Sequence, residues 1–241
     1  MCIRDRYKGK TLQEVYLADK SICGTKGKKY EFFPLLIKFI DAKRDLSIQV
    51  HPDDEYAMRV EGEYGKTEAW YILDCEPDAE LILGFNRNVT VEEFKKAAQG
   101  DEMMSICNRV KVKKGDVFFI ESGTMHAICK GILLAEVQQN SNTTYRIYDY
   151  GRLGKDGKPR ELHVDKAADV TKLCPPSIPD SSKREVEKFD NASRSKLTSC
   201  DLFTMYELSV DGEYSSVCDE QSFVSLLSLI HISEPTRLAL I

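Results

Sequence analysis

Short apolar segments separated by turn residues recur between residues 30 and 150, and this pattern restricts the folds open to the chain. Each segment is rich in β-branched or aromatic residues and too short for a long helix. Many short strands with turns between them are typical of an antiparallel barrel or sandwich, so the sequence predicts a mainly β fold. The expected strands are two within Tyr30–Val50, joined by a polar turn at Asp41–Asp45, then Glu68–Cys75, Ala79–Phe85, Asp116–Ile120, His126–Ile128, Ile132–Gln138 and Thr143–Tyr150.

Helices are expected at two places. Residues Val91–Val110 predict two short helices, with Thr90 as the N-cap of the first and a break at Gly100 and Asp101. Residues Glu161–Leu173 predict a third helix after the strands. The helices are therefore minor elements beside a β core.

The chain divides by composition into a main domain and a smaller one. The main domain is expected at 7–174, a linker at 175–200 that begins with a Pro/Ser/Lys-rich stretch, and a truncated β-lobe at 201–227 with strands at Leu202–Val210 and Ser222–Leu227. The ends, 1–6 and 228–241, resemble translated sequencing-adapter read-through and are expected to be non-native.

Charge and cysteine usage exclude several classes of protein. The formal net charge is −5 and no basic block is present, which argues against a nucleic-acid partner. The eight cysteines show no paired spacing and indicate reduced thiols. With neither a secretory signal nor an 18-residue apolar run, a cytoplasmic protein without a membrane partner is expected.

The segment LSIQVHP at 46–52 places three polar side chains on one face of an apolar strand. Side chains alternate along a strand, so Ser47, Gln49 and His51 share a face opposite Leu46, Ile48 and Val50. Inside a barrel such groups need partners, and an imidazole nitrogen and an amide oxygen are both competent metal ligands. The alternative is an ordinary strand with one solvent-facing polar side.

Two further segments add a carboxylate and a second histidine. Glu68 enters an apolar run two residues after Lys66, where a buried carboxylate must be paired or coordinated. His126 begins a strand directly after the Ser122–Gly123 turn. A Lys66–Glu68 surface pair and a structural His126 are the simpler alternatives, but the coincidence of these residues at strand ends favours a metal site.

At this point the sequence resembles a known family. The segment QVHP with the Glu of KTEAWY, and GDVFFI followed by GTMHAI, resemble the two cupin motifs as they occur in type I mannose-6-phosphate isomerases (phosphomannose isomerases). EVQQNSNTTYRIYDYGR at 136–152 is similar to the family's signature, and the resemblance runs from Tyr30 to Asp169. It implies a cupin-type jelly-roll barrel, with 7–174 as the metal-binding catalytic domain. Glu121 stands where the general cupin motif has Pro, which predicts an altered turn without loss of a ligand.

The resemblance also implies roles for individual residues. One zinc ion per chain is implied, although a site without thiolates also suits manganese, iron or cobalt. For three residues an alternative stays open. Gln49 can support the metal ligands without binding the metal itself, and Lys38 can be a surface lysine. Glu136 can be an acid/base or an anchor for a ligand. A structural ion pair is the alternative for Arg146. The implied metal ligands are Gln49, His51, Glu68 and His126, the implied catalytic residues are Arg146, Lys66 and Glu136, and the implied substrate-binding residues are Ser47 and Lys38.

The activity implied by the resemblance is the interconversion of mannose 6-phosphate and fructose 6-phosphate through a cis-enediol. The expected partner is a small sugar phosphate, and the expected state is a monomer or a weak homo-oligomer. Two alternatives remain: a non-catalytic sugar-phosphate-binding cupin, and an inactive fragment of the isomerase, because the chain is expected to be truncated at both ends. A full metal set together with Arg146 and Lys66 favours the enzyme over the binder.

Overall fold

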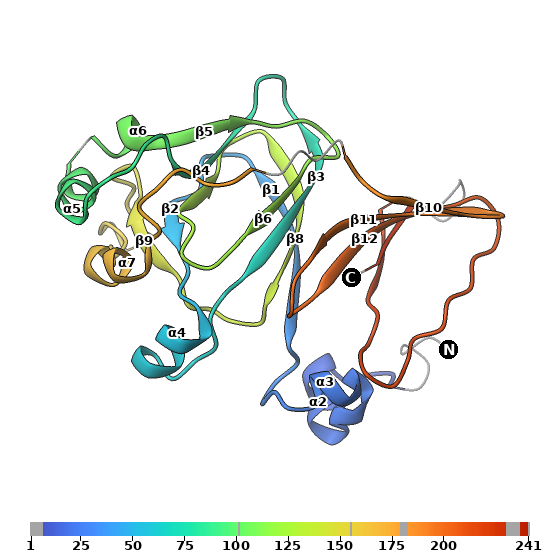
Figure 1. Cartoon of the computed structure of the whole chain (residues 1–241). Coiled ribbons are helices and arrows are strands. Elements are labelled where there is room, and N and C mark those ends of the chain that lie inside the picture. Colours follow the sequence, from blue (N-terminus) through green and yellow to red (C-terminus); the bar gives the residue numbers. More distant parts are fainter. Residues whose placement is uncertain (1–6, 101, 155, 179–182, 230–236, 241) are drawn as a thin grey trace. The chain divides into compact units, whose positions relative to one another are not determined.

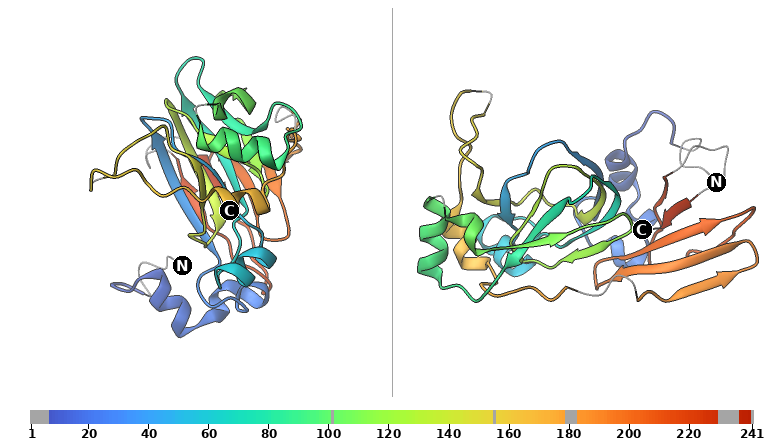
Figure 2. Two further views of the ribbon diagram at one scale, coloured as in Figure 1. Left: turned by 90° about the vertical axis from the view of Figure 1, so that its left-hand side faces the viewer. Right: turned by 90° about the horizontal axis from the view of Figure 1, so that it is seen from above.

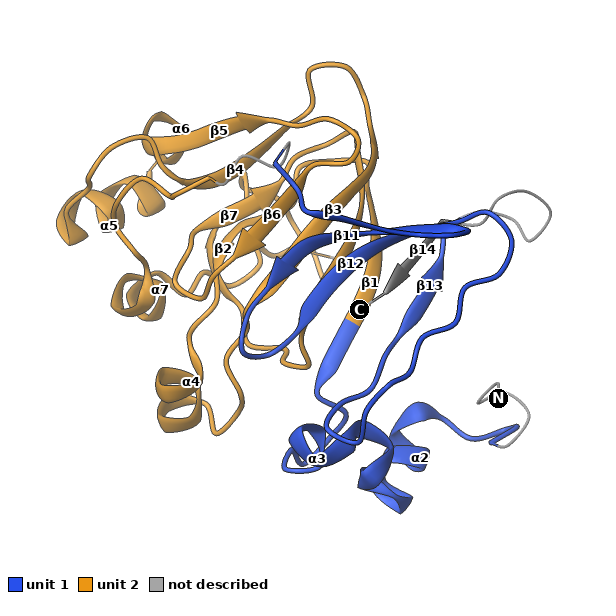
Figure 3. Ribbon diagram, turned by 45° about the vertical axis from the view of Figure 1, so that its right-hand side comes forward, with its two compact units in different colours: residues 1–36, 182–241 blue, residues 37–181 orange. Residues whose placement is uncertain are grey.

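The computed structural model describes residues 7–100, 102–154, 156–178, 183–229 and 237–240. The chain divides into two compact units, which Figure 3 shows in different colours. The described residues of unit 1 lie within 1–36 and 182–241, and those of unit 2 lie within 37–181. Residues 7–36 therefore group with the C-terminal strands, whereas the sequence placed them in the main domain.

Unit 2 is built from two β-sheets (Figure 1), which confirms the expected mainly β fold. The four-stranded sheet has the order β1 (Leu35–Ala42), β8 (Ile132–Gln139), β3 (Glu68–Cys75), β6 (Val117–Ile120). The five-stranded sheet has the order β5 (Cys107–Lys111), β4 (Glu80–Phe85), β7 (His126–Ile128), β2 (Ile48–Val50), β9 (Tyr145–Tyr148). The two strands expected within 30–50 thus belong to different sheets.

Two apolar clusters show how the sheets pack in a jelly-roll barrel of the cupin type. One cluster takes Trp70 from β3 and Leu81 from β4, so it lies between the sheets. The other combines Ile82 of β4 with Phe94 and covers the outer face of the five-stranded sheet. Neighbouring residues of β4 thus face opposite sides, as strand alternation requires. Burying such a side chain contributes about 1.5–3 kcal/mol.

Short helices cover that outer face. These are α5 (Val91–Gln99), α6 (Met103–Ile106) and α7 (Val164–Val170), and they lie together in both views of Figure 2. A further helix, α4 (Asp54–Val60), follows β2. Thr90 caps α5 as expected, because its side chain accepts a hydrogen bond from the Glu93 backbone N–H.

One helix expectation is wrong. Residues 107–110 were expected in the second helix, but they lie in strand β5, which pairs with β4 from Glu80↔Lys111 to Phe85↔Cys107. Cys107 is buried in the cluster with Phe94, so packing and strand pairing outweigh the weak helix propensity of this segment.

Unit 1 contains small N-terminal helices and a C-terminal sheet. The helices are α2 (Leu12–Ala18), the 3₁₀-helix η1 (Lys20–Cys23) and α3 (Gly24–Gly27). The sheet has the order β10 (Val186–Phe189), β11 (Ala192–Ser199), β12 (Thr204–Val210), β14 (Arg237–Leu240), β13 (Leu226–Ser228).

Several sequence expectations change in this unit. The expected linker at 175–200 contains β10 and β11, which form a hairpin with the register Phe189↔Ala192. The second expected strand of the lobe lies later than 222–227, at β13. Of the ends expected to be non-native, residues 1–6 and 230–236 lie outside the described residues, whereas Arg237–Leu240 pair with β12 and β13.

Candidate metal centre

Three strand ends bring two histidines and a carboxylate together inside unit 2. His51 directly follows β2, Glu68 begins β3 and His126 begins β7, and one ligand atom from each lies within 4.8 Å of the others. Glu68 Oε1 lies 3.3 Å from His126 Nε2, and Glu68 Oε2 lies 3.6 Å from His51 Nε2. All three side chains are buried, so the group is closed off from bulk water.

Backbone carbonyls orient both imidazoles. His51 Nδ1 lies 3.0 Å from the Thr143 carbonyl oxygen, and His126 Nδ1 lies 2.9 Å from the Thr124 carbonyl oxygen. A carbonyl can only accept a hydrogen bond, so each Nδ1 carries the proton and each Nε2 presents a lone pair towards Glu68. This is the arrangement that metal-binding histidines adopt.

Burial disfavours charge on these imidazoles. It lowers the pKa of His51 well below its ordinary value, helped by the neighbouring Lys66 ammonium, and it lowers the pKa of His126 to about 4. Both rings are therefore neutral near pH 7 and able to coordinate a metal.

Glu68 faces these lone pairs as a buried carboxylate. Neither of its oxygens accepts a hydrogen bond, and burial raises its pKa despite the opposing effect of Lys66. The Lys66 ammonium lies 3.1 Å from Glu68 Oε2 and 3.0 Å from His51 Nε2. The two carboxylate oxygens and the two Nε2 atoms thus lie close together, only two of them beside the ammonium, and a divalent cation would satisfy all four. The group therefore has the chemistry of a metal site.

Gln49 lies at the edge of this group. It pairs with His126 across β2 and β7, and its amide nitrogen lies 3.3 Å from His126 Nε2. A half-turn of the amide would present its oxygen instead. Gln49 is therefore within reach of a metal held by the two histidines and Glu68.

A partly buried ion pair continues the polar interior across β8 and β1. The Lys38 ammonium donates to Glu136 Oε1 at 2.8 Å and also to Gln138 Oε1. Trp70 Nε1 donates to Glu136 Oε2 at 3.0 Å, and the Trp70 ring packs edge-on against His126. Both oxygens of Glu136 thus accept a hydrogen bond, and Lys38 pairs with Glu136 although 38% of its side chain is exposed.

Arg146 lies opposite Gln49 in the pairing of β2 with β9, so the two residues share a face of the sheet. Its Nη1 donates to the Glu161 carbonyl oxygen at 2.9 Å, while its Nε is buried without a hydrogen bond. His163 holds this strand: its backbone N–H donates to the Arg146 carbonyl oxygen, and its Nδ1 accepts from the Arg146 N–H. None of the described ion pairs involves the Arg146 guanidinium; Asp149 pairs with Arg152 and Arg160 instead.

The remaining predicted residue, Ser47, is buried just before β2. Among the described hydrogen bonds, none joins Ser47 to the residues above. The turn at Glu121 closes through the Thr124 N–H to the Glu121 carbonyl and through the Gly123 N–H to the His51 carbonyl. His126 thus keeps its place beside Glu68 although proline is replaced at position 121.

Sequence reasoning missed the residues that orient the site. Thr143 and Thr124 act through their backbone carbonyls, and every residue type has such a carbonyl, so the sequence does not indicate this role. Trp70 was visible as an aromatic strand residue, but its hydrogen bond depends on the cross-strand pair Trp70↔Glu136. Register was the missing information.

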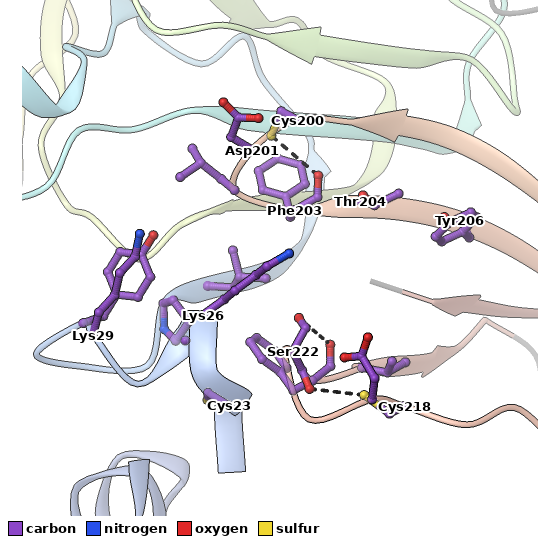
Figure 4. A pocket seen from close by; sticks show the side chains of 18 of the residues that line it. Cys23, Lys26, Lys29, Cys200, Asp201, Phe203, Thr204, Tyr206, Cys218 and Ser222 are labelled. Atoms are coloured by element: carbon purple, nitrogen blue, oxygen red, sulfur yellow. Dashed lines mark hydrogen bonds between the residues drawn. The ribbon is translucent and has the colours of Figure 1, made fainter. Parts of the chain in front are cut away.

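Unit 1 holds a separate cavity of about 680 Å³. Figure 4 shows Cys23, Lys26, Phe203 and Tyr206 on its wall. It contains none of the residues predicted for the site, so the candidate centre is assigned from its side chains and not from the size of a cavity.

A jelly-roll barrel with two oriented, neutral imidazoles and a carboxylate defines a metal-binding protein of the cupin type. The model of the family "Phosphomannose isomerase type I, catalytic domain" matches residues 2–90. The chain belongs to the type I phosphomannose isomerase family, as the following relatives show.

Two curated relatives come from Bacillus subtilis (strain 168). The chain is 44% identical to the mannose-6-phosphate isomerase ManA over 93% of its own length and 69% of that protein. It is 45% identical to the probable mannose-6-phosphate isomerase GmuF over 85% of its own length and 64% of that protein. The chain therefore spans about two thirds of the length of these relatives.

A crystal structure of the mannose 6-phosphate isomerase from Bacillus subtilis has a similar fold. It matches with a TM-score of 0.81 and 35% sequence identity, over 97% of this chain and 76% of that one. The fold of the family thus extends through both units of this chain.

Proposed function

We propose that the chain is a metal-dependent aldose–ketose isomerase that interconverts mannose 6-phosphate and fructose 6-phosphate through a cis-enediol. The observation that carries the proposal is the buried His51–Glu68–His126 group with the Lys66 ammonium beside it. The relatives named mannose-6-phosphate isomerase supply the substrate. A protein that only binds a sugar phosphate needs cations for the phosphate, but it has no need of a convergent metal-ligand set.

Zinc is the proposed metal, one ion per chain, held by His51, Glu68, His126 and the Gln49 amide oxygen. Two neutral imidazoles and one carboxylate are a common zinc ligand set and leave about one unit of positive charge on a divalent ion. When bound, the metal acts as a Lewis acid that polarises sugar oxygens. The same oxygen and nitrogen donors suit other divalent metals, so metal analysis of the purified protein is the direct check.

The chain's own residues then hold the anionic substrate. The Lys66 ammonium is fixed beside the ligands and can donate a hydrogen bond to a sugar oxygen as negative charge develops. The Arg146 guanidinium, on the same face as Gln49, joins none of the described ion pairs and has a free Nε, so it is available to the phosphate or to the enediolate. Lys38 and Ser47 are assigned to substrate binding, as the family resemblance implies.

Glu136 is assigned the role of an anchor. Both of its oxygens accept hydrogen bonds, from Lys38 and from Trp70, so each oxygen already has a donor within the protein. Of the two alternatives left open by the sequence, this geometry favours the anchor over the free acid/base. Glu136 would then fix the Lys38 ammonium for the substrate.

The proposed environment is the cytoplasm, with the chain acting as a monomer or a weak homo-oligomer and without a nucleic-acid partner. The net charge of −5 supports the last point. Within the described part of the chain, no helix is long and apolar enough to cross a membrane.

A coupled assay tests the activity directly. Mannose 6-phosphate is supplied, and the fructose 6-phosphate formed is measured, before and after dialysis against a chelator. Turnover should disappear on metal removal and return when zinc is added back. Binding of mannose 6-phosphate without turnover, in metal-loaded protein, would establish the non-catalytic alternative instead.

Metal affinity should fall as the pH is lowered. Burial raises the pKa of Glu68, and a carboxylate that holds a proton must lose it before it can bind a metal. At pH values between the ordinary pKa of a glutamic acid and the raised pKa of Glu68, metal binding should therefore release a proton from Glu68. In this range the affinity for the metal should weaken as the pH falls. Calorimetric titration of chelator-treated protein in two buffers of different ionisation enthalpy measures this release. A proton release of zero throughout pH 5–7 would contradict the assignment of Glu68.

A further inference from the structure

The loop that carries Lys66 is held from both sides by side chains that lie outside the metal-ligand set. The Gly65 backbone N–H donates to Asp54 Oδ1 at 2.8 Å, and the Thr67 backbone N–H donates to Gln139 Oε1 at 2.8 Å. Between them, the Lys66 N–H donates to the Pro52 carbonyl oxygen at 3.0 Å. Three consecutive backbone N–H groups around Lys66 are therefore fixed.

Asp54 and Gln139 are also joined to each other. Gln139 Nε2 donates to the same Asp54 Oδ1 at 3.0 Å, and the Gln139 backbone N–H donates to the Thr67 carbonyl oxygen at 3.1 Å. Asp54 is the first residue of α4, and Gln139 ends β8 and is buried. The Asp54–Gln139 pair thus ties a helix start and a strand end to the loop between them.

Gly65 shows how closely the loop approaches α4. A Cβ atom at this position would lie 2.3 Å from the Asp53 carbonyl carbon and 2.5 Å from the Asp54 nitrogen. Because these are backbone atoms, they cannot move aside as a flexible side chain would. The close approach brings the Gly65 N–H to the Asp54 carboxylate.

Lys66 needs such support because its ammonium is placed within a narrow range. It lies between His51 Nε2 and Glu68 Oε2, at 3.0 and 3.1 Å, on a side chain that is almost fully buried. Lysine has several rotatable bonds and is not rigid by itself. A fixed backbone at Lys66 therefore narrows the range of positions that the ammonium can reach.

We propose that Asp54 and Gln139 are positioning residues that act through Lys66, by fixing the backbone of residues 65–67 so that the Lys66 ammonium lies beside the metal ligands. The proposal rests on the proposed function for its catalytic consequence, but the positioning itself is a property of the fold. Neither residue touches the metal ligands through a described hydrogen bond, so the metal should bind without them.

The test compares Asp54→Ala with Asp54→Asn. The alanine variant loses the acceptor for Gly65 and Gln139, and kcat for mannose 6-phosphate should fall about tenfold, while bound zinc per chain is unchanged. The asparagine oxygen can still accept both hydrogen bonds, so Asp54→Asn should restore most of kcat. Glu55→Ala is the matched control, because it removes another acidic residue from the first turn of α4, one that takes part in none of the described hydrogen bonds or ion pairs; its kcat should equal that of the unchanged chain.

Lys66→Met separates a path through Lys66 from a general loss of structure. In the Lys66→Met background, adding Asp54→Ala should cause no further fall in kcat, because residues that act as a unit are not additive. An additional tenfold loss in that background, or an equal loss in Glu55→Ala, would overturn the proposal.

A second measurement does not depend on activity. Modification of Lys66 by an amine-reactive reagent, followed by peptide mass spectrometry, should be slow in the unchanged chain and in Asp54→Asn, and at least several-fold faster in Asp54→Ala. If this order is observed but no variant isomerises the sugar, the proposed function fails and the positioning stands. If Asp54→Ala leaves the modification rate unchanged, the positioning is wrong even in an active enzyme.

Discussion

His126→Ala should lose both bound metal and nearly all isomerase activity. The imidazole of His126 presents an Nε2 lone pair 3.3 Å from Glu68 Oε1, and its orientation depends on the Thr124 carbonyl. Alanine removes one metal ligand and leaves Glu68 Oε1 without the neighbouring imidazole. Electrostatic groups of this kind contribute about 3–4 kcal/mol to a transition state, so turnover should fall by roughly two to three orders of magnitude. Zinc analysis after gel filtration and the coupled assay measure the two losses.

Ile128→Val is the control for His126→Ala. It lies two residues further along β7 and faces the same interior, where it is buried. Removing one methylene from a core costs about 0.5–1.5 kcal/mol of stability, yet no metal ligand changes. Ile128→Val should therefore unfold slightly earlier and retain zinc and turnover. If His126→Ala kept both zinc and turnover, His126 would not be a ligand and the proposed centre would have to be abandoned.

The sequence predicted most strands of the barrel because their patterns are local. β3 at Glu68–Cys75 and β7 at His126–Ile128 have the expected bounds. In both cases the run of apolar residues that predicts the strand lies within these bounds. The strand β5 was missed because Cys107–Lys111 gains its structure from pairing with β4, a partner distant in sequence. β10 and β11 were missed for another reason: the side chains of β10 are exposed and those of β11 are mostly polar and only half-buried, so no apolar pattern distinguished them from a linker.

The site was predictable in its members but not in its connections. Side-chain alternation placed Gln49 and His51 on the face opposite Ile48 and Val50, and the contacts agree, because Ile48 and Val50 pack in the cluster with Phe94 whereas His51 lies beside Glu68. The pairing of Glu136 with both Lys38 and Trp70 required three strands in a known order, β1-β8-β3, which no single segment contains. The support of Lys66 by Asp54 required even more, because a helix, a strand and a loop meet there. Local patterns reveal which groups need a partner, whereas the sheet order decides which partner they find.

Arg146→Gln should lose turnover while retaining metal. A variant of a metal ligand, in contrast, should lose both. The Arg146 guanidinium shares a sheet face with Gln49, and none of the described ion pairs neutralises it. Glutamine keeps a polar side chain of similar shape near the backbone but removes the positive charge that an anionic substrate or enediolate requires. The expected fall in kcat/KM is about a hundredfold.

Arg160→Gln provides the matched control for Arg146→Gln, because it removes the same charge from a neighbouring arginine whose guanidinium is already paired. Arg160 donates to Asp149, and Asp149 keeps Arg152 as a second partner, so the loss should be small. If both variants retain zinc and only Arg146→Gln loses turnover, the reaction requires the charge of Arg146 itself. The summed positive charge of the neighbouring arginines would not explain such a result. Equal activity in the two variants would mean that Arg146 is structural, and its unpaired Nε would then need another explanation. The distinction matters because the proposed isomerase needs both a metal site and a cation for its anionic substrate, whereas either alone is common among proteins that only bind.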